Sequence, residues 1–178
     1  VAGHRFRISA ASFFQARPDG ADALVGAVAA ALGCDEDGPP GHLVDLYGGV
    51  GLFAATVGSA ARRVTAVEAS RSAVADARRN APGARHLRLD VRRWRPSRAD
   101  AVVADPSRHG LGAEVVDRIA ATRATRVALV SCDPAALGRD AGLLAAAGYR
   151  LRAATLVELF PHTPHVEVVT SWTKPVHP

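Results

Sequence analysis

Apolar runs of strand length alternate along most of the chain with segments whose apolar positions repeat at helical spacing. Strands are expected over residues 42–47, 64–68, 86–90, 101–105 and 127–131. Helices are expected over residues 20–32, 52–60, 70–80, 113–121 and 134–147. Strands that alternate with helices predict a mostly parallel sheet that is covered on both faces.

The two ends of the chain depart from this alternation. Residues 5–9 predict a short strand, and residues 149–159 and 165–172 predict an antiparallel hairpin at one edge of the sheet. This α/β layout is similar to the Rossmann-like class I fold of S-adenosylmethionine-dependent methyltransferases. We expect one domain over residues 1–178, in which residues 1–40 lead into the core through a loop rich in glycine and proline.

Composition narrows the class of protein. The chain has 178 residues, of which 48% are hydrophobic and 22% are charged, as is typical of a globular domain. No apolar run reaches the roughly 20 residues that a membrane helix needs, so no membrane is expected. Two cysteines, Cys34 and Cys132, are too few for a disulfide scaffold, which favours a cytoplasmic location.

The charge is basic and almost entirely due to arginine. The formal net charge is +5, and Lys174 is the one lysine among 22 basic residues. An anionic partner such as nucleic acid would suit this charge, but a GC-rich genome explains the preference for arginine equally well.

A glycine-rich turn ends the strand at residues 42–47. Ligands in open α/β sheets bind beyond the carboxyl ends of the strands, so we expect the site at residues 45–51, 68–70, 90, 105–108 and 131–134. Gly49 and Gly51 permit a tight turn, and Glu68 can accept the two hydroxyls of a ribose. The same glycines also match a dinucleotide fingerprint, but Asp45, just before the turn, suits a cationic amino acid tail better than a pyrophosphate.

Cys132 stands at a strand end, just before the helix that Pro134 begins. A lone cysteine in an apolar strand is usually inert packing, but a helix N-terminus can lower the pKa of a thiol and favour the reactive thiolate. Cys34 lies in a polar loop without such surroundings.

The remaining candidates follow two other strands. Asp105 leaves an apolar strand toward the expected cleft, and Arg108 could bind a phosphate or carboxylate with two hydrogen bonds or form a salt bridge. His162, His165 and Glu167 could suggest a metal, but two prolines and an extended backbone make a ligand set improbable, and no metal is expected.

Taken together, these segments resemble the RNA 5-methyluridine methyltransferase family of the TrmA and RumA type. The most specific matches are Ser131-Cys132-Asp133-Pro134 and the segment from Phe160 to Glu167. The other matching segments are Ser12-Phe13-Phe14-Gln15, Asp45-Leu46-Tyr47-Gly48-Gly49-Val50-Gly51, Glu68, Asp105-Pro106-Ser107-Arg108 and Leu137-Gly138-Arg139-Asp140. They span nearly the whole chain in the family's order, so the chain resembles the catalytic domain.

The resemblance implies a reaction and roles for the residues. A thiolate from Cys132 would add to C6 of a uracil in tRNA or rRNA, and C5 would then take the methyl group of S-adenosylmethionine. Glu167 matches the family's base, which removes the C5 proton. Gln15, Asp45, Tyr47, Glu68 and Asp105 would hold the cofactor with Gly49 and Gly51, and Arg108 would contact the substrate.

Three other functions stay open at the level of sequence. The first is methylation of cytosine C5 in RNA, which also uses a cysteine nucleophile. The second is a nucleotide-dependent oxidoreductase, which rests on the glycine fingerprint. The third is an inactive RNA-binding module of the same fold, which the replacement of a family asparagine by Leu52 permits.

Overall fold

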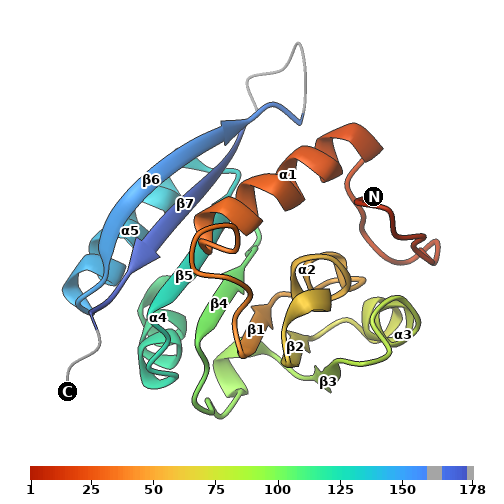
Figure 1. Cartoon of the computed structure of the whole chain (residues 1–178), viewed down its shortest axis with the longest axis horizontal. Helices are drawn as coiled ribbons and strands as arrows, with labels where there is room; N and C mark the ends of the chain where they lie inside the picture. The colour runs from red at the N-terminus through yellow and green to blue at the C-terminus, as the bar shows by residue number, and fades with distance from the viewer. Residues whose placement is uncertain (160–165, 176–178) are drawn as a thin grey trace.

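The computed structural model describes residues 1–159 and 166–175 and has an α/β architecture (Figure 1). The described residues form a seven-stranded sheet in the order β3-β2-β1-β4-β5-β7-β6. The strands are β1 (His42–Leu46), β2 (Arg63–Glu68), β3 (Arg85–Arg88), β4 (Ala101–Ala104), β5 (Arg126–Ser131), β6 (Arg150–Val157) and β7 (Glu167–Thr173). Strands β1 to β5 pair in parallel, which confirms the predicted sheet.

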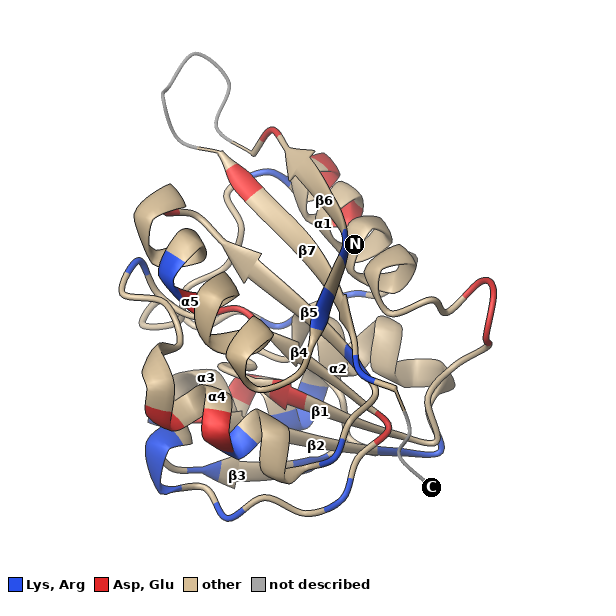
Figure 2. Cartoon of the chain, turned by 90° about the vertical axis from the view of Figure 1, so that its left-hand side faces the viewer, with Lys and Arg blue, Asp and Glu red and all other residues tan. Residues whose placement is uncertain are grey.

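Helices cover both faces of the sheet (Figures 1 and 2). They are α1 (Pro18–Ala31), α2 (Leu52–Ala55), η1 (Val57–Ala60), α3 (Arg71–Asn80), η2 (Val91–Arg93), α4 (Gly112–Ala121) and α5 (Pro134–Ala146). One apolar cluster joins α1 and α2 to one face, and a second joins α4 and α5 to the other. Both faces of the sheet are apolar because successive side chains of a strand point to opposite faces. In β1, for example, Leu43 belongs to the first cluster and Val44 to the second.

The predicted antiparallel edge is confirmed. Strand β7 pairs antiparallel with β5 on one side and with β6 on the other, and a register shift occurs between Leu151 and Ala153 of β6. Among the described residues, no helix has the length and apolar character required to cross a membrane.

Two expectations about local structure are wrong. Residues 5–9 form no strand, because Arg7 and Ser9 use their backbone amides to bind side chains of α3. The helix expected over residues 52–60 is broken into α2 and η1 at Thr56. The Thr56 hydroxyl donates a 2.7 Å hydrogen bond to the Leu52 carbonyl, a local bond that competes with regular helix.

Candidate active site

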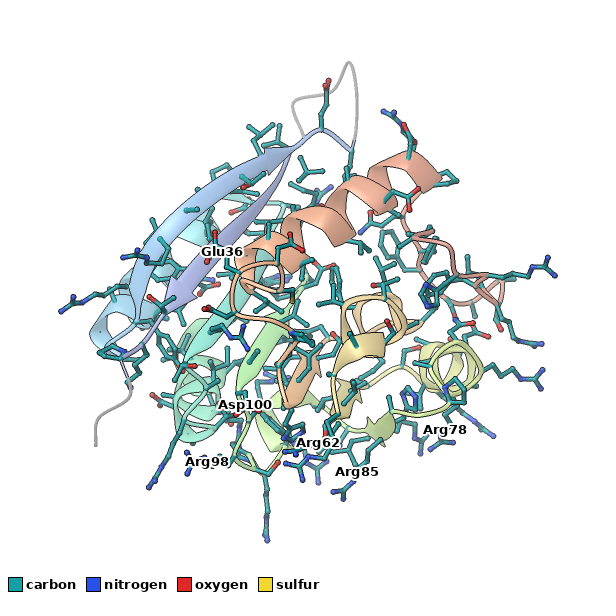
Figure 3. All side chains as sticks on the ribbon, viewed as in Figure 1. Glu36, Arg62, Arg78, Arg85, Arg98 and Asp100 are labelled. Carbon is teal, nitrogen blue, oxygen red and sulfur yellow. The ribbon has the colours of Figure 1, made fainter. Side chains whose placement is uncertain are left out.

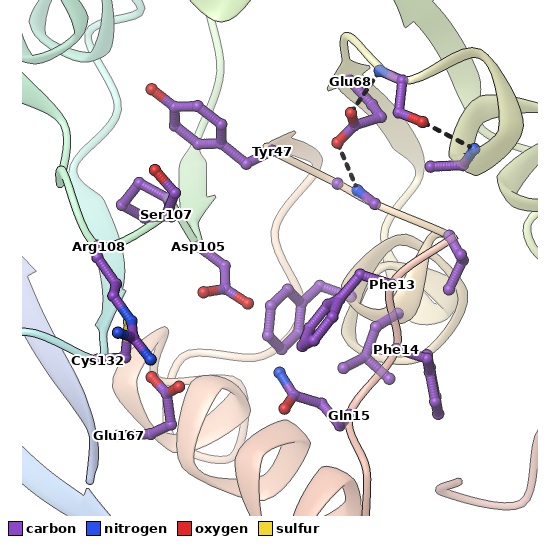
Figure 4. Close-up of a pocket in the computed structure, with 18 of the residues that line it drawn as sticks. Phe13, Phe14, Gln15, Tyr47, Glu68, Asp105, Ser107, Arg108, Cys132 and Glu167 are labelled. Atoms are coloured by element: carbon purple, nitrogen blue, oxygen red, sulfur yellow. Dashed lines mark hydrogen bonds between the residues drawn. The ribbon is translucent and has the colours of Figure 1, made fainter. Parts of the chain in front are cut away.

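A cavity of about 560 Å³ opens at the carboxyl ends of β1, β2, β4 and β5 (Figure 4). This is the edge of the sheet at which ligands bind in such folds. The cavity is lined by Ala11, Phe13, Phe14, Gln15, Tyr47, Gly48, Gly49, Val50, Leu52, Phe53, Glu68, Ser70, Ala73, Asp105, Pro106, Ser107, Arg108, Cys132 and Glu167. Eight of the ten residues expected in the site by sequence, all except Asp45 and Gly51, therefore meet in one cavity.

The glycine turn wraps closely around the base of this cavity. Tyr47 has a φ of 61°, which is rare for a residue with a side chain, and Gly51 has a φ of 90°. A Cβ atom on Gly51 would lie 3.3 Å from both Cα and Cβ of Ala77 in α3. Gly49 lines the cavity, whereas Gly51 lies behind it and permits the close approach of the turn to α3.

Glu68 fixes the shape of the turn from the end of β2. Its Oε2 accepts a 3.0 Å hydrogen bond from the Gly49 amide, and its Oε1 accepts one of 2.6 Å from the Ser70 amide (Figure 4). The carboxylate thus links the glycine turn to the N-cap of α3, and it still lines the cavity.

Asp45, expected to bind the cofactor, is buried and does not line the cavity directly. Its side chain is buried, Oδ2 accepts a 3.1 Å hydrogen bond from the Ala54 amide, and Oδ1 has no partner among the described residues. Burial raises the pKa of Asp45 to about 8, although the Ala54 amide opposes the shift. A buried carboxylate with one free oxygen is a feature that a cationic or hydrogen-bonding ligand would stabilise.

The N-terminal segment covers the cavity and brings Gln15 and Phe13 to it (Figure 4). Phe13 lines the cavity while its side chain stays 76% exposed, and the sequence did not predict a separate role for it. Asp76 of α3 holds the segment in place. Its carboxylate accepts hydrogen bonds from the Ser9 amide and from the hydroxyls of Ser9 and Ser12, at 2.7–2.8 Å.

These bonds explain the acidity of Asp76. Burial alone would raise its pKa, but hydrogen bonds from Ser9, Ser12 and Arg7 outweigh it and hold the pKa at about 2. No sequence pattern singled out Asp76, because its partners lie more than sixty residues away.

Cys132 and Glu167 are brought together by the antiparallel pairing of β5 with β7. Ser131 at the end of β5 pairs with Val168, so the next residue, Cys132, follows beside Glu167 at the start of β7. Glu167 is 7% exposed, and its Oε2 has no partner among the described residues. Burial raises the pKa of Glu167 to about 7, which suits a group that takes up a proton near neutral pH.

The pKa of the Cys132 thiol is shifted in the direction opposite to the one expected from sequence. Burial, followed by the charges of Glu167 and Asp105, raises its pKa above the ordinary value, whereas a lowered pKa was predicted. Asp133, rather than Cys132, is the N-cap of α5, and it accepts a 2.7 Å hydrogen bond from the Ala136 amide. Arg108 opposes the shift, so a cation near the thiol favours the thiolate.

Asp105 and Arg108 reach the same part of the cavity from the loop after β4 (Figure 4). Burial and then the charge of Glu167 raise the pKa of Asp105 to about 7. Asp140 of α5 anchors this loop, because its carboxylate accepts hydrogen bonds from the amides of Leu111 at 2.6 Å and Gly112 at 3.1 Å. Asp140, which belongs to the segment Leu137-Gly138-Arg139-Asp140 noted in the sequence, thus holds the loop after β4 against α5.

No group of three or more metal-ligating side chains occurs within residues 1–159 and 166–175. His162 and His165 lie outside the described residues.

Comparison with known proteins identifies the family. An uncharacterized RNA methyltransferase of Streptomyces avermitilis is 37% identical over 180 residues, and the match covers 94% of this chain. The 23S rRNA (uracil(1939)-C(5))-methyltransferase RlmD of Pseudomonas putida is 40% identical over 139 residues, which cover 72% of this chain. The chain belongs to the RNA uracil-C5 methyltransferase family.

The solved structures agree with this membership. The tRNA (uracil-54, C5)-methyltransferase of Pyrococcus abyssi, in complex with S-adenosyl-L-homocysteine, superposes with a TM-score of 0.83 and 30% identity over 94% of this chain. A magnesium protoporphyrin IX methyltransferase from Synechocystis, at 15% identity and a TM-score of 0.71, shares the fold. No protein-family model matches the chain.

The chain spans only part of these relatives. It covers 40% of the Streptomyces protein, 30% of RlmD and 42% of the Pyrococcus chain.

Proposed function

We propose that this chain is a catalytic domain that transfers a methyl group from S-adenosylmethionine to C5 of a uridine in tRNA or rRNA. The observation that carries the proposal is the meeting of Cys132 and Glu167, from two different strands, in the cavity that the glycine turn also lines. We further propose that the enzyme acts in the cytoplasm, where these RNAs are abundant.

The nucleophile in this proposal is the Cys132 sulfur. The thiolate forms a bond with C6 of uracil, and the electron pair of the C5–C6 double bond moves into an enolate that is nucleophilic at C5. S-adenosylmethionine, when bound, would supply an electrophilic methyl group: the new bond to C5 forms as the bond between that methyl group and the sulfonium sulfur breaks, and S-adenosylhomocysteine is released. Arg108 lies beside the thiol and favours its anion, so it contributes at the step in which the sulfur attacks.

Glu167 completes the reaction as the base. It removes the proton from C5, the C5–C6 double bond forms again, and the bond between C6 and the sulfur breaks. A pKa of about 7 and an oxygen without a partner among the described residues support this role.

The residues around the glycine turn fit the methyl donor. Gly49 allows the backbone to approach the ligand closely, and Glu68, at the end of β2, can accept ribose hydroxyls. The free oxygen of Asp45 lies beneath the turn and is available to a donor on the ligand side or through water. Gln15, Tyr47 and Asp105 line the remaining wall.

The nucleophile is tested with tRNA and rRNA transcripts that contain 5-fluorouridine, in which C5 carries no removable proton. The wild-type protein should form a covalent complex that survives a denaturing gel. Cys132→Ala should form none, whereas Cys34→Ala, which removes the other free thiol, should behave as wild type. Retained binding of S-adenosylhomocysteine by Cys132→Ala shows that the variant is folded, and a surviving adduct in it would contradict the assignment.

The base is tested on normal RNA. Glu167→Gln should leave adduct formation intact and slow its resolution, so a covalent complex should accumulate while turnover falls by roughly 10²–10⁴-fold. Wild-type turnover in this variant would remove Glu167 from the mechanism. Analysis of the methylated nucleoside distinguishes uridine from cytidine as the target.

A further inference from the structure

Positive charge is concentrated in one part of the chain. Between residues 62 and 98 there are eleven arginines and three carboxylates, an excess of eight positive charges in a chain whose net charge is +5. The rest of the chain is therefore slightly acidic. A genome that favours arginine over lysine explains the type of residue but not this concentration.

The fold places these arginines along one edge of the molecule. Segment 62–98 forms β2, α3, β3 and η2, and β3 is the edge strand of the sheet. Figure 2 shows basic residues along β3 and the loops beside it, and Figure 3 shows Arg62, Arg78, Arg85 and Arg98 projecting along the same rim. We call this surface, formed by the arginines of residues 62–98, the β3 rim.

The carboxylates of the segment leave most of this charge free. Asp76 is buried and binds the N-terminal segment, and Glu68 binds backbone amides. Asp90 forms a salt bridge with Arg92, the one arginine of the β3 rim that does so among the described residues.

Two hollows on the β3 rim are each lined by three arginines. A groove of about 550 Å³ between α3 and β3 has Arg71, Arg78 and Arg88 around Val74 and Ala75, and no carboxylate lines it. A second hollow, of about 420 Å³, is lined by Arg62, Arg63 and Arg98 together with His42 and the exposed carboxylate of Asp100. Asp100 accepts a 2.7 Å hydrogen bond from the His42 amide. Concave surfaces with several guanidinium groups suit phosphate oxygens, which arginine binds with two hydrogen bonds.

We propose that the β3 rim binds the phosphate backbone of the substrate RNA, away from the nucleotide that is methylated. The inference rests on the proposed function, since it assumes that RNA is the substrate. Four strand spacings of about 4.8 Å separate β3 from β5, so the rim lies roughly 20 Å along the sheet from Cys132. Arg71 directly follows Ser70, which lines the catalytic cavity, so the groove between α3 and β3 begins beside the mouth of that cavity. The arginines of the second hollow lie at the amino ends of β2 and β4, at the other end of the strands. When a uridine of the RNA is bound at Cys132, the phosphates of flanking nucleotides contact the arginines of the β3 rim.

The test uses two matched pairs of exposed arginines on the two opposite edge strands. Arg85→Gln/Arg88→Gln changes β3, and Arg150→Gln/Arg152→Gln changes β6. Binding of fluorescein-labelled bulk tRNA is measured by anisotropy between 50 and 200 mM salt. The salt slope is the change of log Kd with the logarithm of the salt concentration, and each phosphate contact contributes about 0.7–0.9 to it. The β3 pair should lose two contacts, so the increase in its Kd between 50 and 200 mM salt should be about 7- to 12-fold smaller than for wild type. The β6 pair should keep the wild-type slope.

Three results would overturn the proposal: an unchanged slope in the β3 pair, an equal change in both pairs, or no binding of tRNA by the wild-type chain at 50 mM salt. If the β3 pair fails to fold, Arg71→Gln/Arg78→Gln on α3 gives the same test from the other side of the groove. Binding of S-adenosylhomocysteine is measured on every variant. Wild-type cofactor binding and an intact 5-fluorouridine adduct alongside an unchanged salt slope would reject the rim and leave the proposed reaction standing.

Discussion

At the scale of single residues, burial changes the chemistry that the sequence pattern suggests. Glu167 stands between Val166 and Val168 in an alternating pattern that is typical of a strand with one exposed polar face, yet β5 and the start of β7 bury it beside Cys132. The thiol has a raised pKa, and two neighbouring carboxyl groups, Glu167 and Asp105, have pKa values of about 7. The three acidic groups resist ionising together, so the site is not fully charged near neutral pH.

Glu167 should make the protein less stable as pH rises. Its pKa is about 7 when folded and near 4.3 in an unfolded chain, so between these values the folded state holds a proton that the unfolded state lacks. The free energy of unfolding should therefore fall with pH over this window, by about 3 kcal/mol from this group. Glu167→Gln should remove that part of the decline in urea titrations at pH 5 and pH 8.

Glu158→Gln provides the control, because it removes an exposed carboxylate at the other end of the same connection between β6 and β7. It should decline with pH as wild type does. An identical decline in Glu167→Gln and wild type would mean that the burial of Glu167 does not persist in solution.

At the scale of elements, the loops that carry the site are tied to helices by buried carboxylates. Asp76 binds the N-terminal segment to α3, and Asp140 binds the loop after β4 to α5. These contacts also explain errors of the sequence-based prediction. Residues 5–9 have a strand-like pattern, but Asp76 and Asn80 offer their backbone amides side-chain partners instead of a strand. Local periodicity carries no information about such distant partners.

Substitutions at two glycines test the contact between Asp140 and the loop after β4. Gly110 and Gly112 both have a φ of 71°, but a Cβ on Gly110 would collide with the Asp140 carboxylate, whereas a Cβ on Gly112 meets nothing within 4 Å. Gly112→Ala should cost about 1–2 kcal/mol for the backbone conformation alone. Gly110→Ala should cost about 1–3 kcal/mol more and should also lower methylation, because Arg108 shifts with the loop.

Chemical denaturation measures the two costs, and S-adenosylhomocysteine affinity serves as a reference for the rest of the cavity. Equal losses of stability in the two variants would show that Asp140 does not press against the loop.

At the scale of the whole molecule, the cavity exists only when distant parts of the chain are assembled. It combines the N-terminal segment, the glycine turn, the loop after β4 and the paired ends of β5 and β7. That residues 1–178 form one domain stays a prediction. The concentration of charge on the β3 rim, opposite the β6 edge, belongs to the same scale, because it comes from consecutive elements that the sheet order places side by side.

A ligand that binds this assembled cavity should stabilise the fold. At a concentration of 100 times its Kd, S-adenosylhomocysteine should add about 2.7 kcal/mol, which raises the Tm of a chain of this size by roughly 5–10 °C. NADH at the same concentration should leave the Tm unchanged. A shift with NADH and none with S-adenosylhomocysteine would favour the dinucleotide interpretation of Gly49 and Gly51.

The sequence by itself determined the α/β class, the order of strands and helices, the glycine turn and the candidates Cys132 and Glu167. These features follow from periodicity, turn residues and motifs, which are local along the chain. The tertiary structure decided which candidates share a cavity, that Asp45 lies behind its wall and that the thiol pKa is raised. Burial and charge arise between segments that are far apart in sequence, so only the folded arrangement determines them.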